Sequence, residues 1–142
     1  MSQKILKVEK TVDIRFSEVD SMGIVWHGNY ALYFEDAREL FGKTFHLEYL
    51  RMYENGFYAP LVEIKFNFKK VVKYTDKIIV SCAFRDTDAA KIIFDYEIRN
   101  AETDDVMVTG HSVQVFLDRE YNLAWQVPDF MIEWKKKNGL IL

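Results

Sequence analysis

The residues with the clearest chemical potential gather in one stretch, residues 16–40, which reads FSEVDSMGIVWHGNYALYFEDAREL. Asp20 supplies a carboxylate, and His27, Gly28 and Asn29 follow it directly before a segment with helical periodicity. The first turn of a helix presents unpaired backbone N–H groups and the positive end of the helix dipole, which together favour an oxyanion or a developing negative charge. The spacing therefore places an acid a few residues from an electrophilic platform.

The flanking elements that must position this stretch are a strand and a helix. Before it, apolar residues alternate with polar ones through residues 8–16, which predicts a strand with one buried face ending at Phe16. Residues 17–29 break the alternation, and Gly23 and Gly28 give that loop backbone freedom. The apolar residues then adopt helical spacing, at Tyr30, Tyr33, Phe34, Ala37, Leu40 and Phe41.

The rest of the chain predicts strands and one further helix. A second short helical piece is expected at 47–54. Runs of period-two alternation predict strands at 62–69, 78–84 and 92–99, and a long apolar run at 106–117 predicts a central strand or one covered on both faces. The short connections imply antiparallel neighbours.

The C-terminal helix is expected to begin at Pro128 and to stop at Asn138-Gly139. Its lysine run, residues 135–137, is interpreted as a solvated end that matches the helix dipole.

One long helix beside antiparallel strands must bury its apolar stripe on the sheet, so the fold class is α+β, with residues 1–142 forming a single domain.

Composition and charge exclude several classes of function. The formal net charge of -3 gives no field that would recruit nucleic acid, and no Lys/Arg block forms a membrane-binding patch. No run of about 18 apolar residues suggests a membrane span, and the first ten residues, MSQKILKVEK, lack the apolar core of a signal peptide. We therefore expect a cytoplasmic protein.

The metal-ligating and thiol residues are few. The single cysteine, Cys82, lies in an apolar strand-like run, where the role of a small buried hydrophobe is favoured over that of a nucleophile. His46 and His111 show no metal-ligand spacing with each other or with His27, so no metal is predicted.

The central stretch also resembles a known family. Residues 20–30 read DSMGIVWHGNY, and Tyr33-Phe34-Glu35 and Ala37-Arg38 follow. This closely resembles the signature of the hotdog-fold acyl-CoA thioesterases of the 4-hydroxybenzoyl-CoA thioesterase type, which include thioesterases linked to the Tol-Pal system. The resemblance implies a hotdog fold, a long helix wrapped by a curved antiparallel sheet of about five strands, with a C-terminal helix added. It also implies homodimers that pair their sheets edge to edge, with active sites at the dimer interface, and often a dimer of dimers, a homotetramer.

In such an enzyme a thioester carbonyl needs a nucleophile or an activated water on one side and oxyanion donors on the other. The resemblance assigns the first role to Asp20, as nucleophile or as general base, and the second to the backbone N–H of His27, with Gly28 helping. Asp20 capping a turn is the alternative. The imidazole of His27 either contacts ligand or water or is simply a structural histidine.

Several residues of the loop and of the first turns of the helix are candidates for substrate binding. Gly23 would permit close approach of the backbone or merely loop flexibility, and Met22 lines the acyl pocket or only packs. Asn29 is favoured as a helix cap over a ligand contact. Glu35 and Arg38 match the family, although an ion pair within the helix also explains them.

Coenzyme A phosphates call for Lys or Arg at the mouth of the site. Lys91 is the first candidate, with Arg85 and Lys69 behind it. The alternative is that these charges protect strand edges from aggregation.

The expected function is hydrolysis of an acyl-CoA to a carboxylic acid and coenzyme A, without a cofactor. Two alternatives remain, a non-catalytic protein that binds acyl-CoA or acyl-carrier protein, and an acyl thioester hydratase or dehydratase. The sequence offers no convincing His-centred motif for the second alternative. The identity of the acyl group is left open, because one methylene changes selectivity by only about 1–3 kcal/mol.

Overall fold

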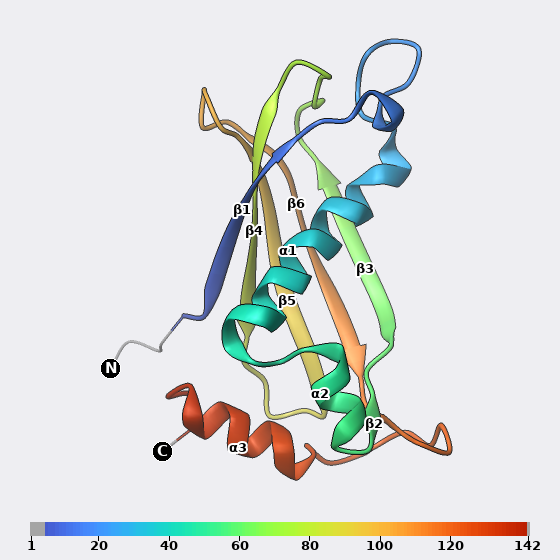
Figure 1. Cartoon of the computed structure of the whole chain (residues 1–142), viewed down its shortest axis with the longest axis vertical. Helices are drawn as coiled ribbons and strands as arrows, with labels where there is room; N and C mark the ends of the chain where they lie inside the picture. Colours follow the sequence, from blue (N-terminus) through green and yellow to red (C-terminus); the bar gives the residue numbers. More distant parts are fainter. Residues whose placement is uncertain (1–4, 142) are drawn as a thin grey trace.

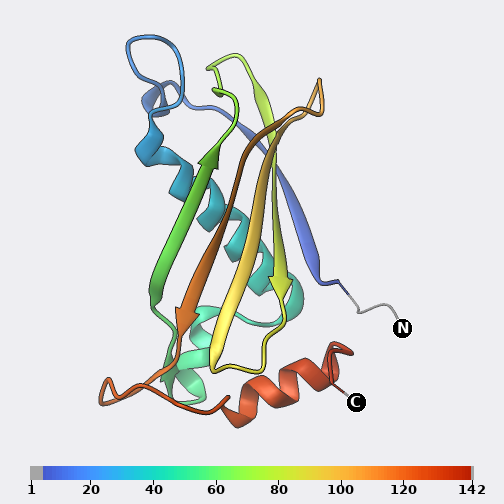
Figure 2. The ribbon, with the colours of Figure 1, turned by 180° about the vertical axis from the view of Figure 1, so that it is seen from behind.

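A long helix, α1, lies against one face of a curved five-stranded antiparallel sheet (Figures 1 and 2). The computed structural model describes residues 5–141. The helices are α1 (Tyr30–Phe45), α2 (Tyr49–Glu54) and α3 (Asp129–Lys137), with two 3-10 turns at Phe16–Glu18 and His27–Asn29. The strands are β1 (Lys7–Asp13), β2 (Phe57–Tyr58), β3 (Leu61–Phe68), β4 (Lys77–Arg85), β5 (Lys91–Asn100), β6 (Val106–Val115) and β7 (Leu117–Asp118).

The sheet confirms the predicted α+β arrangement. Its strand order is β1-β4-β5-β6-β3, and every neighbouring pair is antiparallel. Alternate residues of β5 are buried toward α1, as period-two alternation predicts. The long run at 106–117 is indeed an internal strand, because β6 lies between β5 and β3, but the strand ends at Val115.

The predicted apolar stripe of α1 forms the centre of the core. All its members are buried except Leu40, which is partly exposed. Phe34 stacks on Tyr96 with ring centroids 4.3 Å apart and on Phe66 at 4.9 Å. Gly110 of β6 permits this approach, since a Cβ there would lie 2.7 Å from the Phe34 ring and 2.1 Å from a backbone oxygen of β3.

Several predicted boundaries and burials are wrong. Phe16 is 77% exposed, because β1 ends at Asp13 and Phe16 begins a 3-10 turn instead of continuing the strand. Pro128 is the N-cap of α3, one residue before the helix begins. The two-stranded β2–β7 sheet was not expected, since runs of two residues carry no periodicity.

The lysine run of α3 is only partly solvated, which corrects the sequence interpretation. Lys135 is buried, with its ammonium 2.8 Å from the Asp86 carboxylate and 2.7 Å from the Thr87 carbonyl oxygen. These contacts fasten α3 to the β4–β5 turn. The expected absence of a signal peptide concerned a segment whose residues 1–4 lie outside the described part of the chain.

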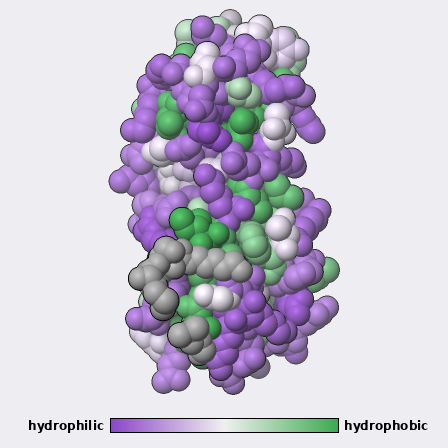
Figure 3. All heavy atoms as spheres, turned by 90° about the vertical axis from the view of Figure 1, so that its left-hand side faces the viewer, coloured by the Kyte–Doolittle hydropathy of each residue, from purple (hydrophilic) through white to green (hydrophobic). Residues whose placement is uncertain are grey.

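The two edges of the sheet differ in character. On β1 five of seven residues are exposed, and all five are polar or charged. Figure 3 shows the side of the molecule that carries β1, and its coloured atoms are mostly hydrophilic. The opposite edge, β3, exposes four large apolar side chains, Leu61, Val62, Ile64 and Phe68. Apolar surface on an unpaired edge strand is a template for pairing with another chain.

Candidate active site

The loop of residues 17–29 folds back on itself between β1 and α1. Val19 and Val25 form an isolated antiparallel bridge, and the Asp20 N–H donates to the Ile24 carbonyl at 2.9 Å. Gly23 closes the turn with a φ of 77°, a left-handed conformation that glycine adopts at little cost. Open space surrounds Gly23, so the turn conformation explains this glycine, not close packing.

Asp20 lies at this turn with its residue partly exposed. Its Oδ1 accepts a hydrogen bond from the Met22 N–H at 2.8 Å. Among residues 5–141, Oδ2 has no hydrogen-bond partner. The carboxylate therefore stabilises the turn with one oxygen, as the alternative interpretation expected, and keeps its other oxygen available.

The backbone at His27 and Gly28 begins the 3-10 turn that leads into α1. Within the described residues neither N–H is paired, whereas the Asn29 N–H already donates to the Trp26 carbonyl at 2.9 Å. Two adjacent free donors at a helix entrance form an anion-binding arrangement. The two N–H groups that the sequence analysis singled out are thus available as donors, while their role stays a prediction.

The side chains around this turn are solvent-accessible. His27 is exposed, and its ring lies against Trp26 with centroids 4.9 Å apart. A Cβ on Gly28 would lie 2.0 Å from the Trp26 ring. Gly28 thus lets that ring fold over the turn. Met22 is 75% exposed, so in this chain alone it neither packs nor lines a cavity.

Asn29 is the N-cap residue of α1, as predicted, but its side chain makes no capping hydrogen bond to the first turn of the helix. Its amide Nδ2 donates to the Glu18 carbonyl at 2.8 Å, an acceptor that also takes the Trp26 N–H at 3.0 Å. Asn29 therefore ties the helix entrance to the end of the preceding 3-10 turn. This long-range partner explains why the amide of the N-cap residue does not bond to the first turn of the helix.

Glu18 is a positioning residue that the sequence did not single out. Its Oε1 accepts hydrogen bonds from the Arg15 N–H at 2.8 Å and from the Tyr33 hydroxyl at 3.1 Å. The buried Tyr33 lies one turn into α1, so Glu18 joins the segment that follows β1 to the helix, next to the Asp20 loop. Burial and the nearby Glu18 carboxylate raise the pKa of Tyr33, which keeps this hydroxyl a donor.

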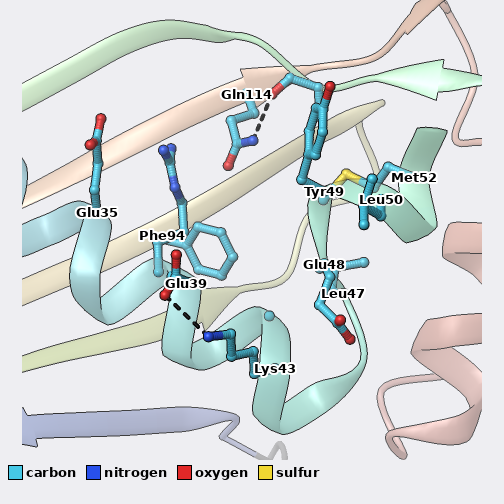
Figure 4. Close-up of a pocket in the computed structure, with 13 residues that line it drawn as sticks. Glu35, Glu39, Lys43, Leu47, Glu48, Tyr49, Leu50, Met52, Phe94 and Gln114 are labelled. Carbon is cyan, nitrogen blue, oxygen red and sulfur yellow. Dashed lines mark hydrogen bonds and ion pairs between the residues drawn. The ribbon is translucent and has the colours of Figure 1, made fainter.

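A cavity of about 530 Å³ lies between α1, α2 and the sheet (Figure 4). Glu35 and Glu39 project from α1 and Gln114 projects from β6, while Tyr49 and Leu50 of α2 lie at the other side. The remaining lining residues are Arg38, Gly42, Lys43, Leu47, Glu48, Met52, Ala59 and Phe94.

Two of these residues correct the expected ion pair on the helix. Glu35 and Arg38 form no salt bridge with each other, and within residues 5–141 Arg38 has no hydrogen-bonded or ionic partner. The pair that does form on this helix is Glu39 with Lys43, 3.3 Å apart. Arg38 thus lines the cavity as a half-buried cation that makes no salt bridge among the described residues.

The three predicted phosphate-binding residues are not brought together. Lys91 and Arg85 flank the β4–β5 turn, at the end of the sheet opposite the loop of residues 17–29 (Figure 1). Arg85 is bonded to Asp95, with its Nε 2.9 Å from Oδ2. Lys69, at the end of β3, lies at the same end of the sheet as that loop. Of these three residues, Lys69 alone lies at the same end of the sheet as Asp20 within one copy of the chain.

Three other polar or titratable groups, those of Cys82, Tyr96 and Ser112, are buried in the core. Burial raises the pKa of Cys82, which is fully buried, as expected for a hydrophobe. Tyr96 and Ser112 share a buried hydrogen bond of 2.7 Å. Among residues 5–141 no group of three His, Cys, Asp or Glu residues has the geometry of a metal site. Within the same range, no helix is both long enough and apolar enough to span a bilayer.

Comparison with known proteins places this geometry in a family. Residues 14–135 match the thioesterase-like superfamily. The chain belongs to this superfamily. YneP of Bacillus subtilis, described as an acyl-CoA thioesterase, is 29% identical over 112 residues, which cover 79% of this chain and 80% of that protein.

Solved structures agree on the hotdog thioesterase fold. DHNA-CoA thioesterase from Staphylococcus aureus is 25% identical and superposes with a TM-score of 0.80, covering 94% of this chain and 92% of that one. A mutant of 4-hydroxybenzoyl-CoA thioesterase in complex with 4-hydroxybenzoyl-CoA is 19% identical, with a TM-score of 0.77 over 91% of this chain and 98% of that one. The second likeness supports the fold alone.

Proposed function

We propose that this thioesterase-like protein hydrolyses acyl-CoA thioesters to a carboxylic acid and coenzyme A. The observation that carries the proposal is the position of the Asp20 carboxylate on the loop that ends at the N–H groups of His27 and Gly28. Among residues 5–141, one oxygen of this carboxylate and both N–H groups have no hydrogen-bond partner. The names of the relatives support the same reaction class.

In the proposed reaction, Asp20 acts at the thioester carbonyl carbon, either directly as nucleophile or by taking a proton from water. Attack opens the carbonyl to a tetrahedral oxyanion, which the N–H groups of His27 and Gly28 stabilise. Collapse breaks the C–S bond, and coenzyme A leaves as a thiolate that takes up a proton. If Asp20 attacks directly, water then cleaves the resulting mixed anhydride and restores the carboxylate.

We further propose that the working site spans two copies of the chain, paired at the β3 edges. The Asp20 loop precedes α1, and the cavity lies beside residues 35–43, about 10–20 Å along the helix at 1.5 Å per residue. Antiparallel pairing of β3 with a second β3 reverses the direction of one copy. Such pairing would bring Asp20 of the partner subunit toward the cavity, and it would cover the exposed apolar residues of β3.

Thiol release measures the proposed activity directly. Wild-type protein is mixed with short, long and aromatic acyl-CoAs, and free thiol is followed with a thiol-reactive chromophore. We expect enzyme-dependent release with at least one acyl class. Thermal stabilisation by acyl-CoA without thiol release from any substrate would instead identify the non-catalytic binding protein.

The oligomeric state tests the proposed two-copy site. We expect a dimer or a larger even-numbered assembly by light scattering. Phe68→Lys, on the exposed apolar edge of β3, should shift the protein toward monomer and reduce thiol release. Lys7→Glu, a charge change on the opposite edge strand, is the matched control. A wild-type monomer with full activity would contradict the two-copy site.

A further inference from the structure

Gln114 presents a buried acceptor without a donor. The residue lies on β6, faces α1 and is 8% exposed. Its amide Nε2 donates to the Ala59 carbonyl at 2.7 Å. Because a carbonyl oxygen only accepts, this contact fixes which end of the amide is nitrogen. The other end, Oε1, is buried and has no hydrogen-bond partner among the described residues.

This oxygen is directed into the cavity described above. In Figure 4 the amide nitrogen follows the dashed line to Ala59, and the oxygen points the opposite way, toward the side of Phe94 and α1. Buried polar atoms in folded proteins are nearly always paired, and one that is not requires an explanation. A ligand group that carries a proton donor would satisfy it.

The charges around the cavity indicate which end of an acyl-CoA would lie beside Gln114 Oε1. Its lining includes three glutamates, Glu35, Glu39 and Glu48, against the two cations Arg38 and Lys43, one of which is paired with Glu39. A wall of net negative charge disfavours the phosphates of coenzyme A. The uncharged acyl end, beside the buried ring of Phe94, fits the cavity better.

We propose that Gln114 is a specificity-determining residue that accepts a hydrogen bond from a hydroxyl group on the acyl chain or ring. This inference rests on the proposed acyl-CoA thioesterase function. A hydroxyl group both donates and accepts, so it can donate to Oε1 while its own oxygen remains able to accept a hydrogen bond. Arg38, which lines the same cavity and has no ionic partner among residues 5–141, is a donor for that oxygen. A site built to bond a hydroxyl rejects the analogue that lacks it, because its buried acceptor is then left unpaired.

Matched substrates test the assignment. Values of kcat/KM are measured for benzoyl-CoA and its three monohydroxylated forms, and for butanoyl-CoA with 3-hydroxybutanoyl-CoA. We expect wild type to prefer at least one hydroxylated member over its parent. In Gln114→Leu, which removes the acceptor, that preference should fall about tenfold or more. Gln126→Leu, the same exchange at an exposed position, should keep the wild-type preference.

Three results would overturn the assignment. They are a wild type without hydroxyl preference, an unchanged preference in Gln114→Leu, and an equal loss on hydroxylated and parent substrates. The last would show that Gln114 contacts the pantetheine amide common to both substrates or acts only on folding.

A second readout separates this inference from the proposed function. The same preference is measured as thermal stabilisation by non-hydrolysable thioether analogues of the paired substrates. Absence of thiol release by wild type would refute the hydrolase, while stabilisation by the hydroxylated analogue that Gln114→Leu loses would still support the contact. Equal stabilisation by both analogues in both proteins would refute the contact alone.

Discussion

Replacing Glu18 by alanine should have two effects: it should loosen the Asp20 loop and lower the stability of the fold. The substitution removes the acceptor of the Tyr33 hydroxyl, 3.1 Å away, and of the Arg15 N–H, 2.8 Å away. Tyr33 is 1% exposed, so water cannot replace the lost acceptor without rearrangement. The Arg15 N–H is exposed and can bond to water.

The magnitude follows from these two environments. A buried hydrogen bond to a charged acceptor contributes about 1.5–3 kcal/mol, and we use the lower end because Glu18 itself is partly exposed. The exposed bond adds about 0.5 kcal/mol. Glu18→Ala should therefore lower the free energy of unfolding by about 2 kcal/mol, which corresponds to roughly 6–8 °C in Tm for a chain of this length.

Urea titrations at 25 °C measure this change, and a double-mutant cycle isolates its main cause. Tyr33→Phe removes the same hydrogen bond from the other side, so the two substitutions should couple by about 1 kcal/mol. Glu18→Gln keeps an acceptor oxygen and should cost less than Glu18→Ala. Additive effects of the two substitutions, or a change below about 0.5 kcal/mol, would refute the role of Glu18 as the tie between loop and helix.

The same contact has a pH signature. Burial and Glu18 raise the pKa of Tyr33 above its ordinary value of 10.0. The unfolded chain therefore releases the phenolic proton first, and this contribution to stability is present below pH 10 and is lost as the pH rises beyond it. Tyr33→Phe should reduce the loss of stability in alkaline solution.

Three further changes have defined outcomes. Gly110→Ala should lower the free energy of unfolding by about 1–3 kcal/mol in urea titrations, because the new Cβ meets a backbone oxygen and the Phe34 ring, and an unchanged stability would contradict that contact. Asp86→Ala leaves the buried ammonium of Lys135 without its carboxylate and should lower the free energy of unfolding by about 2–3 kcal/mol. Lys135→Met removes the buried charge itself and should lower it by less. If urea titrations showed the reverse order, the buried pair would be refuted. Because burial raises the pKa of Cys82, iodoacetamide at pH 8 should label it only in urea, and rapid labelling of the native protein would show that the core opens.

Local periodicity predicted the helices and strands. The hydrogen bonds that position the site residues join segments distant in sequence, and periodicity could not predict them. The spacing of Phe34 and Phe41 identified the buried face of α1, and the alternation of Phe94 and Tyr96 identified that of β5. Phe16 was misplaced because the alternation continues for three residues after the backbone leaves the sheet at Asp13.

In the candidate site, too, the local features were predicted and the long-range contacts were not. The motif located Asp20 and the helix entrance, because acid, loop and helix are consecutive in the chain. It could not identify Glu18, whose partner Tyr33 is 15 residues away, or Gln114, whose partner Ala59 is 55 residues away. Charge counting also could not show that Lys91 lies at the far end of the sheet, since that depends on which way β5 runs.

The most direct test of the proposed catalytic role is the turnover of Asp20→Asn on the best acyl-CoA substrate. Asparagine keeps an Oδ1 that can accept the Met22 N–H, so the turn should persist while the charge is lost. We expect kcat to fall by roughly 10²–10⁴, with an unchanged urea midpoint. Asp88→Asn, at an exposed position in the β4–β5 turn, should keep wild-type turnover. Near-normal kcat in folded Asp20→Asn would contradict the assignment of Asp20 as the reacting group.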